Sequence, residues 1–131
     1  MSRNSIVNTK KTILIVDDSE FVRSYHSHIL EQAHFRVITA VDGSDGLEKL
    51  FTNACDLVLT DINMSNMDGY EFIRRVRADG KYSSLPIIIM STESEGKDKM
   101  KGFDAGANLY LVKPSSPEMM VENIRMILVA N

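Results

Sequence analysis

The stretch Leu57-Val58-Leu59-Thr60-Asp61 decides the interpretation of this chain. Its first four residues are apolar or β-branched, which is typical of a strand that is buried on both faces, as in a parallel sheet. We expect a strand over residues 56–61 with the Asp61 carboxylate at its C-terminal tip. The tips of parallel strands are where open α/β proteins gather their chemistry, so Asp61 is the first candidate functional residue.

Similar patterns recur on both sides of this stretch. Short apolar runs predict further strands over 12–16, 35–40, 86–91 and 108–112. The run at 35–40 is the least apolar, which favours an edge position. Helical spacing, N-terminal capping residues and turn residues predict five helices, which begin near residues 19, 42, 68, 96 and 116. Five strands that alternate with five helices indicate an α/β fold with helices on both faces of one parallel sheet.

The helical patterns also predict which side chains face the core. Apolar positions at helical spacing, and hence candidates for inner faces, include Phe21, Tyr25, Leu47, Leu50, Phe51, Val121 and Ile124. The arginines at 74, 75 and 77 are expected to point outward, and His26 is expected at the surface or the edge of the core. The helix over 96–105 has only Met100, Phe103 and Ala105 as inward candidates and Gly102 in its interior, so we expect it to be the most mobile helix.

Length and composition exclude several classes of protein. The 131 residues suit a single domain, expected over 11–131 after a short lead-in at 1–10, with no separate output domain. The net charge of -3 argues against binding nucleic acid by bulk positive charge. Cys55 is the only cysteine, and no apolar run reaches the length of a membrane span. We expect a cytoplasmic protein, monomeric, with no membrane segment.

Polar residues stand at the C-terminal ends of four predicted strands. The first strand ends in Asp17-Asp18, the third in Asp61, the fourth in Ser91 and the fifth in Lys113. Three carboxylates at one edge repel one another and need a cation, and hard oxygen ligands favour Mg²⁺. A phosphoryl group that moves to a carboxylate needs its equatorial oxygens neutralised, which Mg²⁺ and Lys113 can do while Ser91 donates a hydrogen bond. Because Asp61 leaves a central strand between the acidic pair and the lysine, it is the expected nucleophile.

These motifs together resemble a known family. Ile13-Leu14-Ile15-Val16-Asp17-Asp18-Ser19, Leu59-Thr60-Asp61, Asp68-Gly69, Met90-Ser91-Thr92 and Tyr110-Leu111-Val112-Lys113-Pro114 are similar to the receiver domain of two-component response regulators, nearest to the single-domain chemotaxis type, CheY. The resemblance covers residues 11–129 and implies a flavodoxin-like sheet in the order 2-1-3-4-5.

The resemblance also implies roles for named residues. Asp61 would take a phosphoryl group from a CheA-like histidine kinase. Mg²⁺ would be held by Asp17, Asp18, Asp61 and the backbone carbonyl of Asn63. Ser91 and Lys113 would contact the phosphate, and Tyr110 would report it by turning inward. Thr92, Glu93 and Asn63 would modulate the site, and the Lys113-Pro114 bond would be cis.

Four positions depart from the family pattern. At one of them Ser91 replaces the commoner threonine and keeps the hydroxyl. Ser65 stands where proline is usual, so the loop after Asp61 is expected to be less rigid. Thr92 replaces a smaller residue beside the phosphate site. Ser115 replaces an aromatic that is frequent after Pro114, which puts partner recognition on that face in doubt.

The resemblance leaves several functions open. The leading one is a non-enzymatic switch that, when phosphorylated, binds a partner protein such as a component of the flagellar motor switch. A phosphorelay intermediate or a phosphate sink in another pathway is the alternative within the family. An aspartyl-phosphate phosphatase is an alternative of another class, but such enzymes carry a second aspartate where this chain has Asn63. A third alternative is a degenerate binding module that is never phosphorylated. The complete acidic set, together with Ser91 and Lys113, argues against it.

Overall fold

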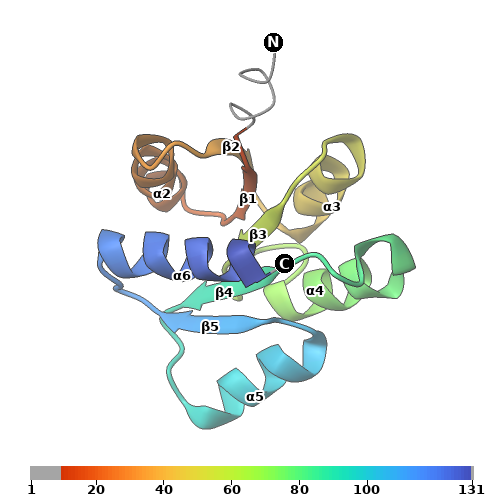
Figure 1. The fold of residues 1–131 in the computed structure, drawn as a ribbon. Coiled ribbons are helices and arrows are strands. Elements are labelled where there is room, and N and C mark those ends of the chain that lie inside the picture. Colours follow the sequence, from red (N-terminus) through yellow and green to blue (C-terminus); the bar gives the residue numbers. More distant parts are fainter. Residues whose placement is uncertain (1–9, 131) are drawn as a thin grey trace.

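Five short parallel strands form one sheet in the order β2-β1-β3-β4-β5 in the computed structural model, which describes residues 10–130 (Figure 1). The strands are β1 (Thr12–Val16), β2 (Arg36–Ala40), β3 (Leu57–Thr60), β4 (Ile87–Ser91) and β5 (Leu109–Val112). The helices are α2 (Glu20–Gln32), α3 (Gly43–Thr52), α4 (Gly69–Ala78), the 3-10 turn η1 (Gly80–Tyr82), α5 (Gly96–Ala105) and α6 (Pro117–Ala130). The predicted α/β class, strand order and edge position of β2 are confirmed. The expected lead-in lies outside the described residues, apart from Lys10.

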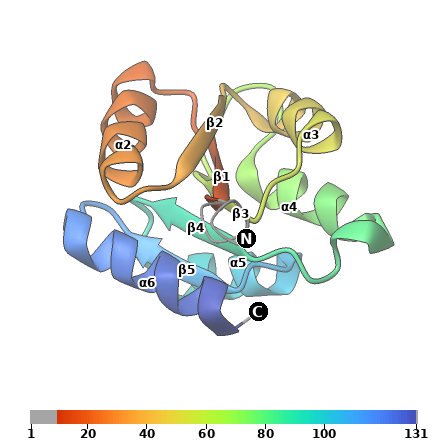
Figure 2. The ribbon, with the colours of Figure 1, turned by 45° about the horizontal axis from the view of Figure 1, so that its top comes forward.

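Helices cover both faces of the sheet. Figure 2 shows α2 beside α6 on one face and α3 with α4 on the other, and α5 lies on the same side as α4 (Figure 1). The strand residues alternate between two cores as their side chains alternate along the backbone. Ile13 and Ile15 of β1 pack in the core beneath α2 and α6, while Leu14 and Val16 pack in the core on the opposite face. Every residue of β1, β3 and β4 is buried, which explains their continuous apolar composition.

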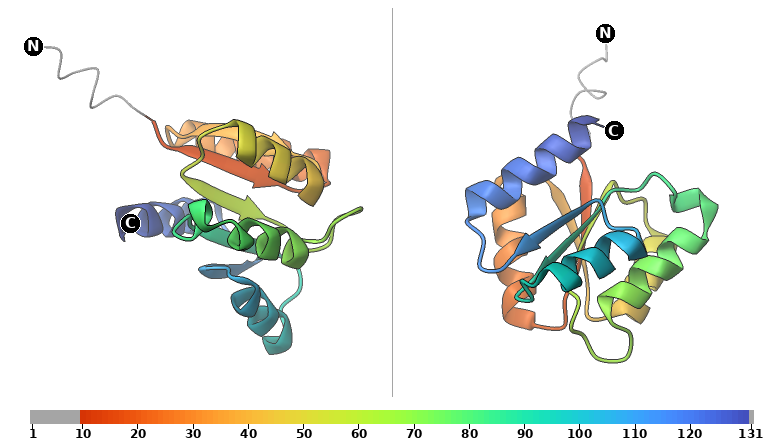
Figure 3. Two further views of the ribbon diagram at one scale, coloured as in Figure 1. Left: turned by 90° about the vertical axis from the view of Figure 1, so that its right-hand side faces the viewer. Right: turned by 90° about the horizontal axis from the view of Figure 1, so that it is seen from below.

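The strand register places the tips of β1 and β3 together. Val16 is paired with Thr60, so Asp17 and Asp61, the next residues of each strand, leave the sheet side by side. The backbone N–H of Asp61 still donates to the Val16 carbonyl at 2.9 Å. Figure 3 shows β1 and β3 running in the same direction, as a parallel pair must. The C-terminal edge therefore gathers the polar residues that follow the apolar strands.

Side-chain caps begin three helices at the positions that the sequence predicts. Ser19, Asp42 and Asp68 each accept a hydrogen bond from the backbone N–H three residues later, at 3.2, 2.8 and 2.9 Å respectively. These bonds satisfy amide groups that have no partner within the helix. The N-cap of α5 is Glu95, whose side chain makes no capping hydrogen bond.

Five of the expected inward-facing side chains are exposed, so those predictions were wrong. The exposed side chains are Phe21, Tyr25, Phe51, Met100 and Phe103. Each lies on the flank of its helix rather than on the stripe that meets the sheet, because an apolar stripe is narrower than the spread of apolar residues that a periodic pattern admits. Three of them stack at the surface instead: Phe21 on Tyr25 with ring centroids 6.3 Å apart, and Phe51 on Tyr82 at 5.9 Å.

Two polar residues lie deeper than the sequence predicts. Arg77, expected to point outward, is half-buried and donates to the carbonyls of Gly106 and Tyr82 and to Asn108 Oδ1, at 3.0, 2.6 and 2.9 Å. His26, expected at the surface or the edge of the core, is only 7% exposed. Periodicity ranks arginine and histidine as polar, but it cannot show that folding brings partner carbonyls, or apolar walls, to their side of the helix.

Among residues 10–130, no helix is both long and apolar enough to cross a membrane.

Candidate functional site

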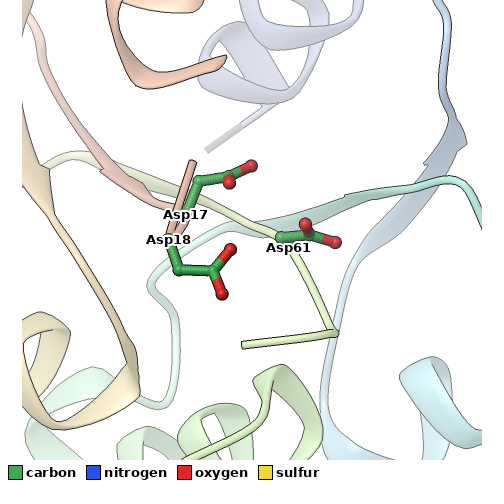
Figure 4. Close-up of side chains that lie close together, drawn as sticks. All are labelled: Asp17, Asp18 and Asp61. Atoms are coloured by element: carbon green, nitrogen blue, oxygen red, sulfur yellow. The ribbon is translucent and has the colours of Figure 1, made fainter. Parts of the chain in front are cut away.

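Three carboxylates gather at the tips of β1 and β3. Asp17 and Asp18 follow β1, and Asp61 follows β3 (Figure 4). Each offers an oxygen, and these oxygens lie within 4.8 Å of one another. Asp17 is buried, Asp61 is half-buried and Asp18 is exposed. The set therefore runs from the protein interior to the solvent, with Asp61 in the middle.

Lys113 brings a positive charge to this cluster from the end of β5. Its Nζ lies 3.0 Å from Asp17 Oδ2 and 3.3 Å from Asp61 Oδ2. The Lys113 side chain is 15% exposed, as is that of Asp61, while the Asp17 side chain is 5% exposed. Loss of the Lys113 ammonium group would leave both carboxylates without a positive partner in this cluster. The Lys113-Pro114 peptide bond is cis, as expected.

Backbone groups fix the orientation of the two inner carboxylates. Asp61 Oδ1 accepts from the backbone N–H of Ile62 at 2.7 Å, which leaves Oδ2 for Lys113. Asp17 Oδ1 accepts from Ser19 N–H at 2.9 Å and likewise leaves Oδ2 for the lysine. Burial raises the pKa of Asp61 above its ordinary value, and the nearby Asp17 charge adds to this effect. Lys113 and the Ile62 N–H act in the opposite direction without cancelling it.

The donor set fits a hard divalent cation. Three carboxylates with one neighbouring lysine carry an excess of negative charge. Burial, and to a smaller extent the charge of Asp17, raise the pKa of Asp61 accordingly. Mg²⁺ prefers one or two carboxylates and completes its shell with other oxygen ligands. Asp18 and Asp61 offer such carboxylates, Asp17 is engaged with Lys113, and Asn63 lies in the exposed loop two residues after Asp61.

Ser91 and Tyr110 are linked through one backbone position. Ser91, fully buried at the end of β4, accepts at its Oγ from the backbone N–H of Glu93 at 3.1 Å. The Tyr110 hydroxyl donates to the carbonyl of the same residue at 2.8 Å. Tyr110 is 8% exposed, so its ring is already buried in this structure, whereas the resemblance predicts that it turns inward on phosphorylation. If Ser91 Oγ moves away from the Glu93 N–H, the backbone of Glu93 loses one hydrogen bond, and the carbonyl of the same residue is the one that holds the Tyr110 hydroxyl.

Comparison with known proteins agrees with this geometry. Residues 13–125 match the response regulator receiver domain family. The chain belongs to this family. Its receiver domain is 36% identical, over 121 residues, to chemotaxis protein CheY1 of Helicobacter pylori strain J99, covering 91% of this chain and 98% of that protein. The solved structure of chemotaxis response regulator CheY4 of Vibrio cholerae has a TM-score of 0.86 and 36% sequence identity, covering 91% of this chain and 99% of that one.

Some relatives are longer than this chain. The receiver domain is 37% identical over 101 residues to the gliding motility regulatory protein of Myxococcus xanthus, but it spans only 13% of that protein. It spans 51% of the response regulator ArlR of Staphylococcus saprophyticus, at 37% identity over 116 residues.

Two contacts around Asp61 could not be foreseen from the motifs. Asp42 Oδ2 accepts from the Asn66 side chain at 2.7 Å, which ties the loop after β2 to the loop after β3. The hydrogen bond from Asp45 N–H is the main cause that lowers the pKa of Asp42, and the Asn66 bond adds to it. Gly69 donates from its N–H to the Ile62 carbonyl at 2.8 Å. These two hydrogen bonds hold the loop that contains Ser65. The sequence predicts a less rigid loop from the replacement of proline by Ser65, and it gives no sign of these bonds.

The remaining predicted residues lie on the solvent side of the receiver site. Thr92 and Glu93 follow β4 and are exposed, as is Asn63. Ser115 behaves differently: its Oγ is buried and has no hydrogen-bond partner.

Proposed function

We propose that this receiver domain accepts a phosphoryl group on Asp61 from the phosphohistidine of a CheA-like histidine kinase. The observation that carries the proposal is the position of the Asp61 carboxylate: its Oδ2 lies 3.3 Å from Lys113 Nζ, and one oxygen each of Asp17, Asp18 and Asp61 lie within 4.8 Å of one another. A nucleophilic carboxylate is thus flanked by a cation on one side and by metal-binding groups on the other. This is the arrangement that phosphoryl transfer to a carboxylate requires.

The residues divide the work of transfer between them. An Asp61 oxygen attacks phosphorus, the bond to the donor nitrogen breaks, and an acyl phosphate forms. Mg²⁺, when bound, supplies positive charge to the transferring oxygens. Lys113 supplies a second positive charge, and its pairing with Asp17 keeps it at the site before transfer. Hydrolysis of the acyl phosphate returns Asp61 to a free carboxylate, so the domain acts as a timed switch and not as an enzyme for a separate substrate.

The switch runs through Glu93. We propose that Ser91 Oγ, in binding a phosphoryl oxygen, releases the Glu93 N–H and draws the loop after β4 toward Asp61. The Tyr110 hydroxyl, bonded to the Glu93 carbonyl, follows this loop and stays buried. The exposed side chains of Asn63, Thr92 and Glu93 border the phosphate and set the access of water to it. Phosphorylation then biases the surface that β5, α5 and α6 form.

We further propose that the domain acts as a monomer in the cytoplasm and that its phosphorylated form binds a protein effector. Relatives of similar length are named as chemotaxis proteins, which supports a role in chemotaxis or motility signalling and an effector such as a flagellar motor switch component.

Labelling tests the acceptor. Purified protein is incubated with acetyl phosphate and Mg²⁺, and the mass of the intact chain is measured. We expect one phosphoryl group on the wild type, none on Asp61→Asn, and unchanged labelling of Asp104→Asn, whose exposed carboxylate lies outside the site. Full labelling of Asp61→Asn would overturn the assignment.

Capture of cell proteins on the immobilised receiver domain, with and without beryllofluoride, tests for the effector. An effector should bind the beryllofluoride form of the wild type and should not bind Asp61→Asn.

A further inference from the structure

A small cavity, here called the cavity behind Lys113, is lined by Lys113 but by none of the three carboxylates. It is bounded by α2, by the end of β4 and by the turn that follows β5, and its volume is about 180 Å³. Val22, Met90 and Pro114 give it apolar walls, and the Tyr25 ring stands at its edge. Tyr25 is 46% exposed and stacks on Phe21, so this edge opens toward the solvent.

Two polar side chains, Ser115 and His26, line this cavity, and Ser115 Oγ has no partner among residues 10–130. Ser115 Oγ is buried and makes no hydrogen bond. The His26 imidazole lines the same cavity, and the residue is 7% exposed. Buried polar groups are normally satisfied, and leaving one unsatisfied is destabilising. A ligand that enters here gains hydrogen bonds that the protein itself does not make.

The charges around the cavity select a neutral ligand. Lys113 is the formal cation that lines it, and its Nζ is already held by Asp17 and Asp61. Burial and the positive charge of Lys113 lower the pKa of His26, so its imidazole stays neutral near pH 7, although Asp17 acts in the opposite direction. A charged ligand would therefore be desolvated without a free counter-charge.

The size and the walls select an aromatic ligand. A cavity of about 150 Å³ with apolar walls is large enough for benzene. This cavity is slightly larger and carries two hydrogen-bonding groups, so it suits an aromatic ring with one hydroxyl group. The hydroxyl group can donate to one of the two polar groups and accept from the other.

We propose that the cavity behind Lys113 is a binding site for a small neutral aromatic alcohol of the phenol class. The ring lies between Val22, Met90 and Pro114, and the hydroxyl group hydrogen-bonds with His26 and Ser115. The site is separate from the carboxylate cluster and shares only Lys113 with it. Occupation of the cavity restricts the space into which the Lys113 side chain can withdraw from Asp61.

Binding is tested on the unphosphorylated protein with phenol as the probe, so this test does not depend on the proposed phosphorylation. Amide chemical shifts around residues 22–26 and 113–115 are followed by NMR during titration, and the expected dissociation constant is on the order of 1 mM. Toluene, which cannot form the hydrogen bonds, should bind about five- to tenfold more weakly. Absence of saturable shifts in this region up to the solubility of phenol would overturn the proposal.

Variants locate the ligand within the cavity. Ser115→Ala keeps the space and removes the hydroxyl, so the preference for phenol over toluene should fall about threefold or more. Ser115→Phe fills the space and should abolish binding of both probes. Ser83→Ala, an exposed serine outside the cavity, should bind phenol as the wild type does. An unchanged preference in Ser115→Ala would show that the ligand lies elsewhere, even if Ser115→Phe does not fold.

The effect on Asp61 rests on the proposed function and is measured separately. Protein labelled with acetyl phosphate is freed of donor, and the loss of phosphate is timed with and without saturating phenol. We expect at least a twofold shorter half-life with phenol in the wild type and no change in Ser115→Phe, because a braced Lys113 keeps its positive charge where negative charge develops as water attacks the acyl phosphate. Equal half-lives would overturn the link between the cavity and Asp61. Failure of labelling itself would instead contradict the proposed function.

Discussion

At the scale of single residues, Asp61 is held in a position where its charge is unfavourable for stability. Burial raises its pKa in the folded protein, so ionisation at neutral pH opposes folding. A raised pKa means that the folded chain binds this proton more readily than the unfolded chain does. The stabilising contribution of the protonated Asp61 carboxyl is therefore complete at pH values below the pKa of Asp61 in the unfolded chain. It is lost as the pH rises through the pKa of Asp61 in the folded chain.

This predicts that Asp61→Asn is more stable than the wild type at pH 7 in EDTA. The advantage should shrink as the pH is lowered toward the folded pKa of Asp61, because the wild-type carboxyl then becomes neutral as well. Lys113 keeps its ion pair with Asp17 in the variant. Urea unfolding of both proteins at a series of pH values measures the difference. A difference that stays constant with pH would contradict the assignment of the effect to Asp61 ionisation.

Gly69 is a second residue whose role comes from close packing. A Cβ at this position would collide with the Asp61 carbonyl oxygen and lie 2.8 Å from Ile62 Cα, and both are backbone atoms that cannot rotate away. Gly69→Ala should lower the free energy of unfolding by about 2 kcal/mol or more and displace Asp61. Gly96→Ala is the matched control, because nothing lies within 4 Å of its added Cβ, and it should be neutral or stabilising by up to about 1 kcal/mol. Equal effects in chemical denaturation would argue against a packing requirement at Gly69.

At the scale of helices and strands, local patterns predict where elements lie better than they predict what the flanks of helices touch. The apolar strands and the caps Ser19, Asp42 and Asp68 fix the element positions, because those signals are local in the chain. Arg77 escapes such reasoning, since its acceptors at Tyr82, Gly106 and Asn108 are brought together only by folding.

Arg77 connects α4 to the turns before β4 and β5. Its guanidinium makes three hydrogen bonds, at 2.6, 2.9 and 3.0 Å, and its removal would leave their acceptors unpaired. We expect Arg77→Ala to lower the free energy of unfolding by about 2–3 kcal/mol. Arg74→Ala serves as the control in the same helix. The Arg74 side chain is 55% exposed and, among residues 10–130, pairs only with Glu71, so the variant should lose no more than about 0.5 kcal/mol. Similar losses in the two variants would show that the three bonds add no stability.

The helix α5 remains the element that we expect to open most easily. Its N-cap lacks a side-chain hydrogen bond, and Met100 and Phe103 are exposed, which leaves Gly102 and Ala105 as its buried residues. Amides of α5 should exchange with solvent faster than those of α6. Glu95→Ser introduces a capping hydroxyl and should slow exchange in α5 by stabilising the helix by about 1 kcal/mol. Equal protection of α5 and α6 in the wild type would refute this prediction.

At the scale of the whole molecule, the sequence predicts the chemistry of the site because one rule of α/β topology determines where the site residues lie. Parallel strands with apolar interiors bring their C-terminal tips to one edge, so Asp17, Asp18, Asp61 and Lys113 can be placed together without coordinates. The Asp42–Asn66 bond and the cavity beside Ser115 lie outside that rule. They depend on side-chain packing between loops and helices that are distant in the chain, which strand patterns do not encode.

The same gathering of carboxylates links metal binding to global stability. The acidic oxygens within 4.8 Å of one another repel in the folded chain, and a cation that binds them binds the unfolded chain far less well. Mg²⁺ at ten times its dissociation constant should therefore raise the free energy of unfolding by about 1.4 kcal/mol relative to EDTA. Asp18→Asn should start from a higher stability in EDTA, since one like charge is removed, and gain much less from Mg²⁺. Asp104→Asn should respond as the wild type does. Urea unfolding of the three proteins at fixed ionic strength measures these gains, and an equal gain for Asp18→Asn would place the metal at some other site and remove it from the chemistry of Asp61.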